Sequence, residues 1–237
     1  MPKIAVINES KGVTDANVQK MLPAFTQQWN KDLLPIWGVE KATFTFVPKS
    51  KKPPSGSWWL VFLNDSDQAG ALAYHDLTDE GLPISKVFCN TILSQHDSIS
   101  VGATHELVEM AVDPWLNSAY QDPKGTFWAG EIADPVEDDQ YGYKIGDVLV
   151  TDFVTPSWFA HQHSGGKIDL KGHADAAFRV LTGGYAQKFE DGTWEQVTGA
   201  QAAKGKQAVA APGSRRERRK REWKNWRRSD VVWRQKK

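Results

Sequence analysis

The segment Thr104–Pro114 (Thr-His-Glu-Leu-Val-Glu-Met-Ala-Val-Asp-Pro) constrains this chain most. Its pattern predicts one amphipathic helix that ends at Asp113, because the residue before a proline is pushed out of the helical region. Residues four apart lie on the same helix face, so His105 and Glu109 can reach the same point. Glu106 lies beside them. Glu106 could then touch a water held at that point.

His105, Glu106 and Glu109 form a His-Glu-x-x-Glu pattern, which differs from the His-Glu-x-x-His helix of metalloproteases only at the second ligand. Carboxylate oxygen binds zinc at about 2.0–2.2 Å, so a divalent metal fits the pattern and zinc is the first candidate. The carboxylate makes the site harder and also admits manganese, iron or calcium. The alternative is a solvated helix face, because so short a motif also arises by chance.

A catalytic metal usually has three protein ligands, and the helix supplies two. Asp113 lies eight residues beyond His105, roughly 12 Å along a helix, so it cannot share the metal. We expect Asp113 to end the helix or to bind neighbouring backbone. The third ligand must come from elsewhere, and His161 and His163 are one possible source.

The elements that precede this helix are predicted from apolar patterns. A helix capped by Thr14 carries apolar residues at helical spacing, and Pro23 would either kink it or mark its true start. The residues between 65 and 83 are rich in Gly and Asp and are expected to form a loop. The predicted strands are 3–8, 42–48, 58–63 and 86–93.

The resulting order, β-α-β-β-β-α, resembles the upper half of the zincin metallopeptidases. There a mixed sheet packs on two helices, and its last strand borders the substrate cleft. The resemblance implies an α+β, zincin-like fold: a mixed β-sheet with two long helices, then an irregular β-rich C-terminal half and a basic tail.

In thermolysin-like enzymes the third ligand is a Glu some tens of residues after the helix, followed by an Asp that orients a ligand His. By this resemblance Glu131 is the third metal ligand and Asp134 the orienting carboxylate. The spacing between them is three here, whereas thermolysin-like enzymes have four. Glu137 is a second choice for the ligand.

If the protein is an enzyme, Glu106 would act as general base on water at the metal during hydrolysis of a peptide or protein substrate. Tyr143, or Tyr141, is a candidate donor to the developing oxyanion, although tyrosines near a turn more often serve packing. His75 and Asp76 could line the cleft, but an ordinary surface position is the simpler expectation for His75.

The second half contains two predicted hairpins, 141–154 with a turn at Gly146-Asp147 and 185–197 with a turn at Asp191-Gly192. Residues 201–214 are rich in Ala and Gly and predict a linker. The expected organisation is therefore a zincin-like domain over 1–200, the linker, and a tail over 215–237.

Beyond the helix, the chain resembles a family of uncharacterised bacterial and phage proteins with a zincin-like motif. The resemblance spans roughly 58–198 and implies a common fold and, through Glu131, a common site, but no substrate. The stretches that carry it are Asp67–Thr78, Thr104–Met110, Asp139–Tyr143 and Gly183–Tyr185.

The tail has 12 Lys/Arg and three acidic residues, a net charge of +9, so the remainder of this neutral chain carries −9. Its cations and its three Trp could bind nucleic acid or a protein such as a capsid or assembly component. This supports an alternative function: a non-enzymatic structural or assembly protein, virion-associated in a phage, with a zincin-like scaffold.

No run approaches the ~18 apolar residues of a membrane span, and the N-terminus predicts a strand, not a signal peptide. The single cysteine, Cys89, excludes an intrachain disulfide and favours a reducing compartment. The expected location is therefore cytoplasmic or virion-associated.

Overall fold

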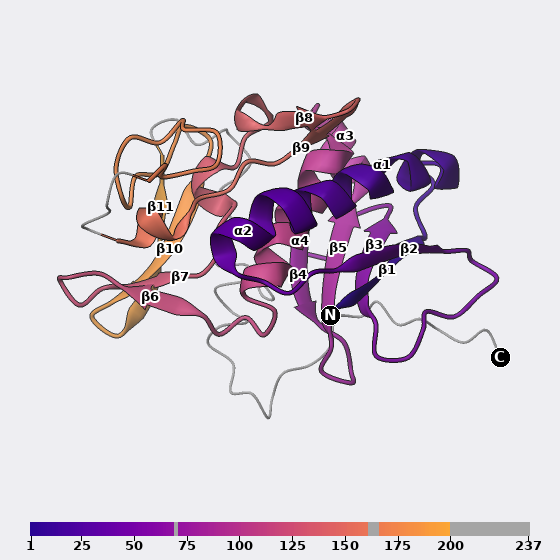
Figure 1. Cartoon of the computed structure of the whole chain (residues 1–237), viewed down its shortest axis with the longest axis horizontal. Helices are drawn as coiled ribbons and strands as arrows, with labels where there is room; N and C mark the ends of the chain where they lie inside the picture. Colours follow the sequence, from indigo (N-terminus) through magenta and orange to yellow (C-terminus); the bar gives the residue numbers. More distant parts are fainter. Residues whose placement is uncertain (69–70, 161–165, 200–237) are drawn as a thin grey trace.

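The computed structural model describes residues 1–68, 71–160 and 166–199. A five-stranded mixed sheet with the order β2-β1-β3-β5-β4 forms the centre of the N-terminal half (Figure 1). Four strands run parallel, and β4 pairs antiparallel with β5 at one edge. The strands are β1 (Lys3–Asn8), β2 (Thr43–Val47), β3 (Trp58–Leu63), β4 (Ala73–Leu77) and β5 (Pro83–Phe88).

A long helical run follows β1. Thr14 caps it, because its side chain accepts a hydrogen bond from the Asn17 N–H. The run comprises α1 (Asp15–Gln27), the π-helical η1 (Gln28–Leu33) and α2 (Leu34–Trp37). Pro23 lies inside α1, so it does not mark the start of the helix.

The predicted helix around His105 is α4 (Ile99–Val112), with 14 residues. It ends at Asp113, whose Oδ1 accepts the N–H groups of Asn117 and Ser118, as its expected role at the helix end requires. The architecture thus has one long helical run and this shorter helix, where two long helices were expected.

The main core lies between one face of the sheet and the helices α1 and α4, which cover that face together (Figure 1). Alternate strand residues point to this face, as the two-residue period of a strand requires. The contributing side chains include Ile4, Val6, Leu60, Phe62 and Val87 from the sheet and Val18, Phe25, Leu107 and Met110 from the helices.

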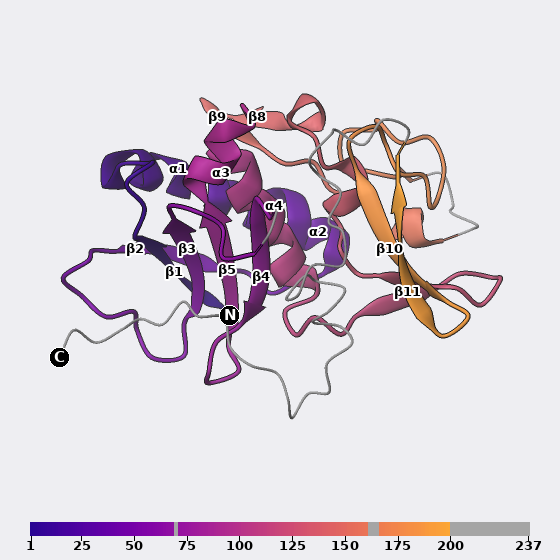
Figure 2. The same ribbon diagram turned by 180° about the vertical axis from the view of Figure 1, so that it is seen from behind.

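The C-terminal half forms a second, antiparallel sheet in the order β11-β10-β7-β6. Figure 2 shows its strands β10 and β11 to one side of the first sheet. Its strands are β6 (Ala119–Gln121), β7 (Phe127–Ala129), β10 (Tyr185–Glu190) and β11 (Thr193–Thr198). Three 3-10 turns, η2 (Asp134–Val136), η3 (Asp139–Tyr141) and η4 (Pro156–Phe159), and the hairpin of β8 (Tyr143–Ile145) with β9 (Val148–Val150) connect them.

Both predicted hairpins are present, with turns at the predicted residues. In the second hairpin Asp191 and Gly192 have φ values of 50° and 79°, the backbone that a tight Asp-Gly turn needs. Val108 of α4 and Leu33 of η1 pack into the core of this half. The helices are therefore shared by both halves.

Two predictions between residues 65 and 94 are wrong. The Gly- and Asp-rich segment 65–83 contains a strand, β4, and that strand is the edge of the sheet. The predicted strand 86–93 ends at Phe88, and Cys89–Ser94 forms the helix α3. A short apolar run does not distinguish strand from helix, which explains the second error.

The mixed α+β class is confirmed, and the β-rich C-terminal half is present. The linker 201–214 and the tail 215–237 lie outside the described residues. Within the described ranges, no helix has both the length and the apolar character needed to cross a membrane.

Candidate metal centre

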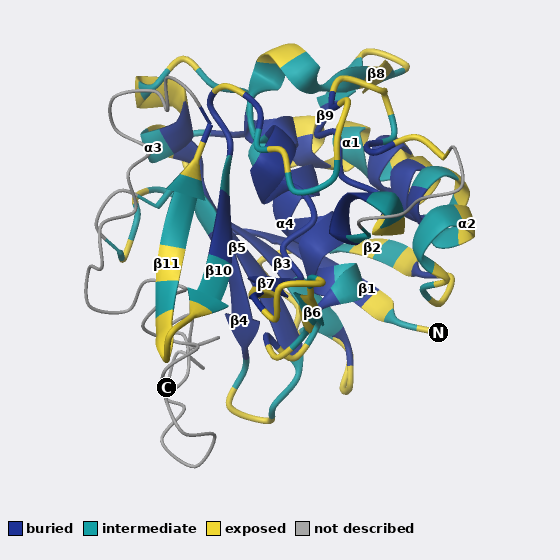
Figure 3. Cartoon of the chain, turned by 90° about the vertical axis from the view of Figure 1, so that its left-hand side faces the viewer, coloured by how far each residue is buried: buried dark blue, intermediate teal, exposed yellow. Residues whose placement is uncertain are grey.

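Helix α4 is buried along most of its length, between the sheet and the C-terminal half (Figure 3). Its polar residues are buried together with its apolar ones: the exposed fraction is 5% for His105, 2% for Glu106 and 0% for Glu109. A solvated helix face is thereby excluded. Buried charged groups must find hydrogen-bond, ion-pair or metal partners, so their contacts identify the site.

His105 Nε2 lies 3.1 Å from Asp134 Oδ1 and 3.3 Å from Glu109 Oε1. The predicted acidic segment after β7 therefore does reach this helix face. Asp134 contacts the same ring nitrogen that Glu109 faces, not the opposite nitrogen. This position suits a co-ligand of His105, because an orienting carboxylate would bond the ring nitrogen that does not bind the metal.

Glu109 is held in place by the loop that carries Glu131 and Asp134. Its Oε1 accepts hydrogen bonds from the backbone N–H groups of Ala133 and Asp134 at 3.2 and 3.3 Å. These bonds fix the plane of the carboxylate. Its two oxygens consequently point to two different neighbours, His105 and His75.

His75 is a candidate site residue that the sequence interpretation placed wrongly. It was expected at the surface, but it is fully buried on the edge strand β4. Its Nδ1 lies 3.2 Å from Glu106 Oε2 and 3.8 Å from Glu109 Oε2, and its Nε2 lies 3.9 Å from Glu131 Oε2. The residue was missed because the Gly- and Asp-rich flanks of β4 concealed a strand.

The structure places the candidate ligands in two groups. Within each group, one donor atom from each residue lies within 4.8 Å of the others. One group is His105, Glu109 and Asp134, and the other is His75, Glu109 and Glu131. Glu131 is therefore close to the centre, as expected, but it lies with His75. Glu106 connects the groups, since its Oε1 lies 4.0 Å from His105 Nε2 and its Oε2 faces His75.

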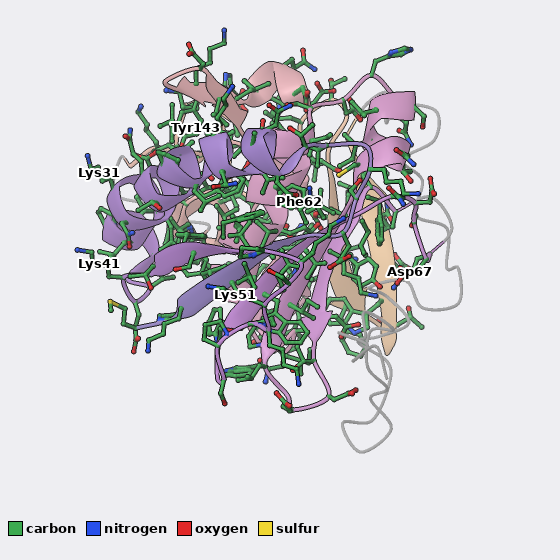
Figure 4. The ribbon with its side chains drawn as sticks, turned by 90° about the vertical axis from the view of Figure 1, so that its right-hand side faces the viewer. Lys31, Lys41, Lys51, Phe62, Asp67 and Tyr143 are labelled. Atoms are coloured by element: carbon green, nitrogen blue, oxygen red, sulfur yellow. The ribbon has the colours of Figure 1, made fainter. Side chains whose placement is uncertain are left out.

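Tyr143 is not among the residues that the structure groups with His105. Its hydroxyl donates a hydrogen bond to Asp32 Oδ2 in η1 at 2.6 Å, and its side chain lies over the helical run (Figure 4). Burial and the Asp32 carboxylate raise the pKa of Tyr143, so it stays protonated. The ring of Tyr141 packs against His173 instead. His161 and His163 lie outside the described residues.

The carboxylates around His105 create a negative potential that stabilises positive charge between them. Burial alone lowers the pKa of the His105 imidazole, because a charged ring loses its hydration. The neighbouring carboxylates, with Glu109 first, outweigh burial and hold the pKa of His105 well above its ordinary value. A divalent cation at the same place would satisfy the same negative potential.

The donor spacing fits a tetrahedral cation best at His105. Two ligand atoms at about 2.1 Å from such a cation lie roughly 3.4 Å apart. The distances from His105 Nε2 to Glu109 and Asp134, 3.3 and 3.1 Å, are close to this value. At His75 the two carboxylates face different ring nitrogens: Glu109 Oε2 lies 3.8 Å from Nδ1, and Glu131 Oε2 lies 3.9 Å from Nε2.

A third group, Asp152, Asp169 and His173, lies in the C-terminal half. Asp169 already accepts the backbone N–H groups of Gly172, His173 and Ala174, which makes it part of a loop anchor. The Asp152 carboxyl is hydrogen-bonded to Asp169, and burial together with that neighbour raises the pKa of Asp152 to about 9. This group therefore has a structural explanation.

Comparison with protein-family models, curated proteins and solved structures gives no match. The assignment of function consequently depends on the geometry of the centre.

Proposed function

We propose that the protein is a metal-dependent hydrolase whose centre is formed by α4, the edge strand β4 and the loop that follows β7. The observation that carries the proposal is the convergence of His105, Glu109 and Asp134, whose donor atoms lie within 4.8 Å of one another. Zinc fits this mixed nitrogen and oxygen donor set, and the spacing at His105 agrees with its preferred tetrahedron.

A divalent cation held there would polarise a substrate carbonyl and lower the pKa of water at the site. Glu106 is the residue placed to take the proton. Its Oε2 is 3.2 Å from His75 Nδ1, and its Oε1 is 4.0 Å from His105 Nε2. His75 thus orients one oxygen of Glu106 and leaves the other turned towards the metal ligands. A general base needs this combination of fixed position and reach.

Peptides or proteins are the proposed substrates. The support is the His-Glu-x-x-Glu spacing on a buried helix, together with an antiparallel edge strand that contributes His75. Both features are expected for a zincin-like peptidase, which is the finer fold assignment that we propose. In this proposal Asp134 takes the place of Glu131 as the third ligand at His105, and Glu131 lies with His75.

The test compares peptide cleavage by metal-loaded wild type, Glu106→Gln and Glu80→Gln. Glu80 is exposed in the turn between β4 and β5, so it is the matched control. Loss of a general base lowers the rate by about 10²–10⁴-fold. We expect that loss for Glu106→Gln, with metal retained, and wild-type turnover for Glu80→Gln. Equal turnover by Glu106→Gln would refute the role of this residue.

The burial of the centre favours a second candidate function, that of a structural or assembly protein. The His105 side chain is only 6% exposed, whereas a catalytic metal keeps an open position for substrate. A metal that stabilises a structural or assembly protein, virion-associated in a phage, needs no such opening. In this account the basic tail 215–237 provides the contact with nucleic acid or with a capsid protein.

Deletion of residues 215–237 separates the two candidates. A hydrolase keeps its metal and its cleavage rate without the tail, whereas an anchoring protein loses its association. If the partner is nucleic acid, affinity for a DNA duplex must fall steeply as salt increases, because cations of the tail would displace counterions. Affinity that does not change with salt excludes this partner.

A further inference from the structure

The two oxygens of Glu109 face two different histidines. Oε1 lies 3.3 Å from His105 Nε2, and Oε2 lies 3.8 Å from His75 Nδ1. The side chain is fully buried, and two backbone N–H groups of the loop after β7 fix its plane. A carboxylate in this position can serve two centres at once.

Each side of Glu109 has its own additional carboxylate. Asp134 Oδ1 completes the group on the His105 side, at 3.1 Å from the imidazole nitrogen. Glu131 Oε2 lies on the His75 side, 3.9 Å from Nε2, the ring nitrogen of His75 that does not face Glu109, and one donor atom from each of His75, Glu109 and Glu131 lies within 4.8 Å of the others. The two groups therefore have the same composition: one imidazole, one carboxylate that belongs to that group alone, and the shared Glu109.

We propose that the centre binds two divalent cations, bridged by Glu109, with His105 and Asp134 on one and His75 and Glu131 on the other. The proposal rests on the proposed function, because it assumes that the first cation is present. Pairs of metal ions in hydrolytic sites lie about 3.5–4 Å apart. A carboxylate that binds one ion through each oxygen allows this separation.

Charge supports the second cation. Four carboxylates meet in the buried centre, those of Glu106, Glu109, Glu131 and Asp134. Two protonated imidazoles offset at most two of these negative charges, and neutral imidazoles, which metal ligands must be, offset none. If all four carboxylates are ionised, one divalent cation would leave two negative charges among them, whereas two cations would neutralise all four. Buried charge is tolerated only when it is compensated.

The bridged arrangement also explains the position of Glu106. Its carboxylate extends from the His75 side, at 3.2 Å, to the His105 side, at 4.0 Å. A base between two cations is adjacent to both.

The experiment is a titration of the metal-free, full-length protein with Mn²⁺, followed by calorimetry and by electron paramagnetic resonance. Wild type should bind two equivalents, and the second should convert the signal of isolated Mn²⁺ into that of a spin-coupled pair. Glu131→Gln preserves the shape of the side chain but removes a carboxylate that only the second ion would use. This variant should therefore bind one equivalent of Mn²⁺ without spin coupling. Asp152→Asn, in the separate group with His173, should behave like wild type.

The outcomes separate the two proposals. One equivalent in wild type overturns the bridged pair and leaves the single-metal function standing. No binding overturns both. Two equivalents without spin coupling, or a second equivalent that disappears in Asp152→Asn, place the second ion elsewhere and also overturn the bridged pair. Circular dichroism of each variant shows whether it has folded.

Discussion

His75 Nδ1 lies 3.2 Å from Glu106 Oε2, although 31 positions separate the two residues in the sequence. The contact joins the edge strand β4 to helix α4. Through this contact, a histidine of the edge strand lies among the acidic residues of α4 and of the loop after β7. The candidate centre is thus a product of three elements, and changes in any one of them should affect metal binding.

His105→Ala should remove the metal of the proposed hydrolytic site, because this imidazole lies within 3.3 Å of both the Glu109 and the Asp134 carboxylate. Metal analysis after gel filtration measures the loss. His173→Ala is the matched control, since His173 belongs to the separate group in the C-terminal half. Full retention of metal by His105→Ala would contradict the ligand assignment.

Asp134→Asn should weaken metal binding by at least 10–100-fold, the loss typical even when only a carboxylate partner of a ligand histidine is removed. Its size and shape are preserved, so the fold should persist. A competition titration with a chromophoric chelator measures the affinity. Asp147→Asn, exposed in the turn between β8 and β9, serves as control. Unchanged affinity in Asp134→Asn would place this residue outside the centre.

Asp152 should make stability depend on pH. Its pKa is about 9 in the fold and 3.8 when unperturbed, because burial and Asp169 disfavour its charged form. Between these values the folded state binds more protons than the unfolded state, so stability falls as pH rises from about 4 to about 9. Urea denaturation of wild type and Asp152→Asn at several pH values measures this. The variant should show a smaller fall; an identical profile would contradict the prediction.

Thr14→Ala should lower the free energy of unfolding by about 1 kcal/mol, because the Asn17 N–H loses its capping partner. Chemical denaturation measures the change. Thr14→Ser keeps the hydroxyl and should retain most of the stability. Equal stability of Thr14→Ala and wild type would show that the cap is not required for the long helical run.

Features encoded in a few consecutive residues were predictable. The Thr14 cap, the strands 3–8 and 58–63 and the two hairpin turns depend on local patterns, and all are present. The shared face of His105 and Glu109 follows from helix geometry alone. Asp113 was expected at the helix end because Pro114 follows it. It was excluded as a ligand because it lies eight helical residues beyond His105.

The missed parts depend on contacts between distant segments. His75 is buried because β4 pairs with β5, where His75 lies opposite Ser85, and nothing near His75 in the sequence indicates that pairing. The proximity of Asp134 to His105 depends on how the loop after β7 turns around Glu109. The spacing of acidic residues brings Glu131 and Asp134 to the helix but does not decide which carboxylate faces which histidine.

The most direct test of the account is the metal content of full-length protein purified without chelators and checked by titration with Zn²⁺. The account predicts at least one tightly bound equivalent per chain in wild type and its loss in His105→Ala. Wild-type protein that carries no metal and binds none on titration would contradict the metal centre, and with it the proposed hydrolytic function.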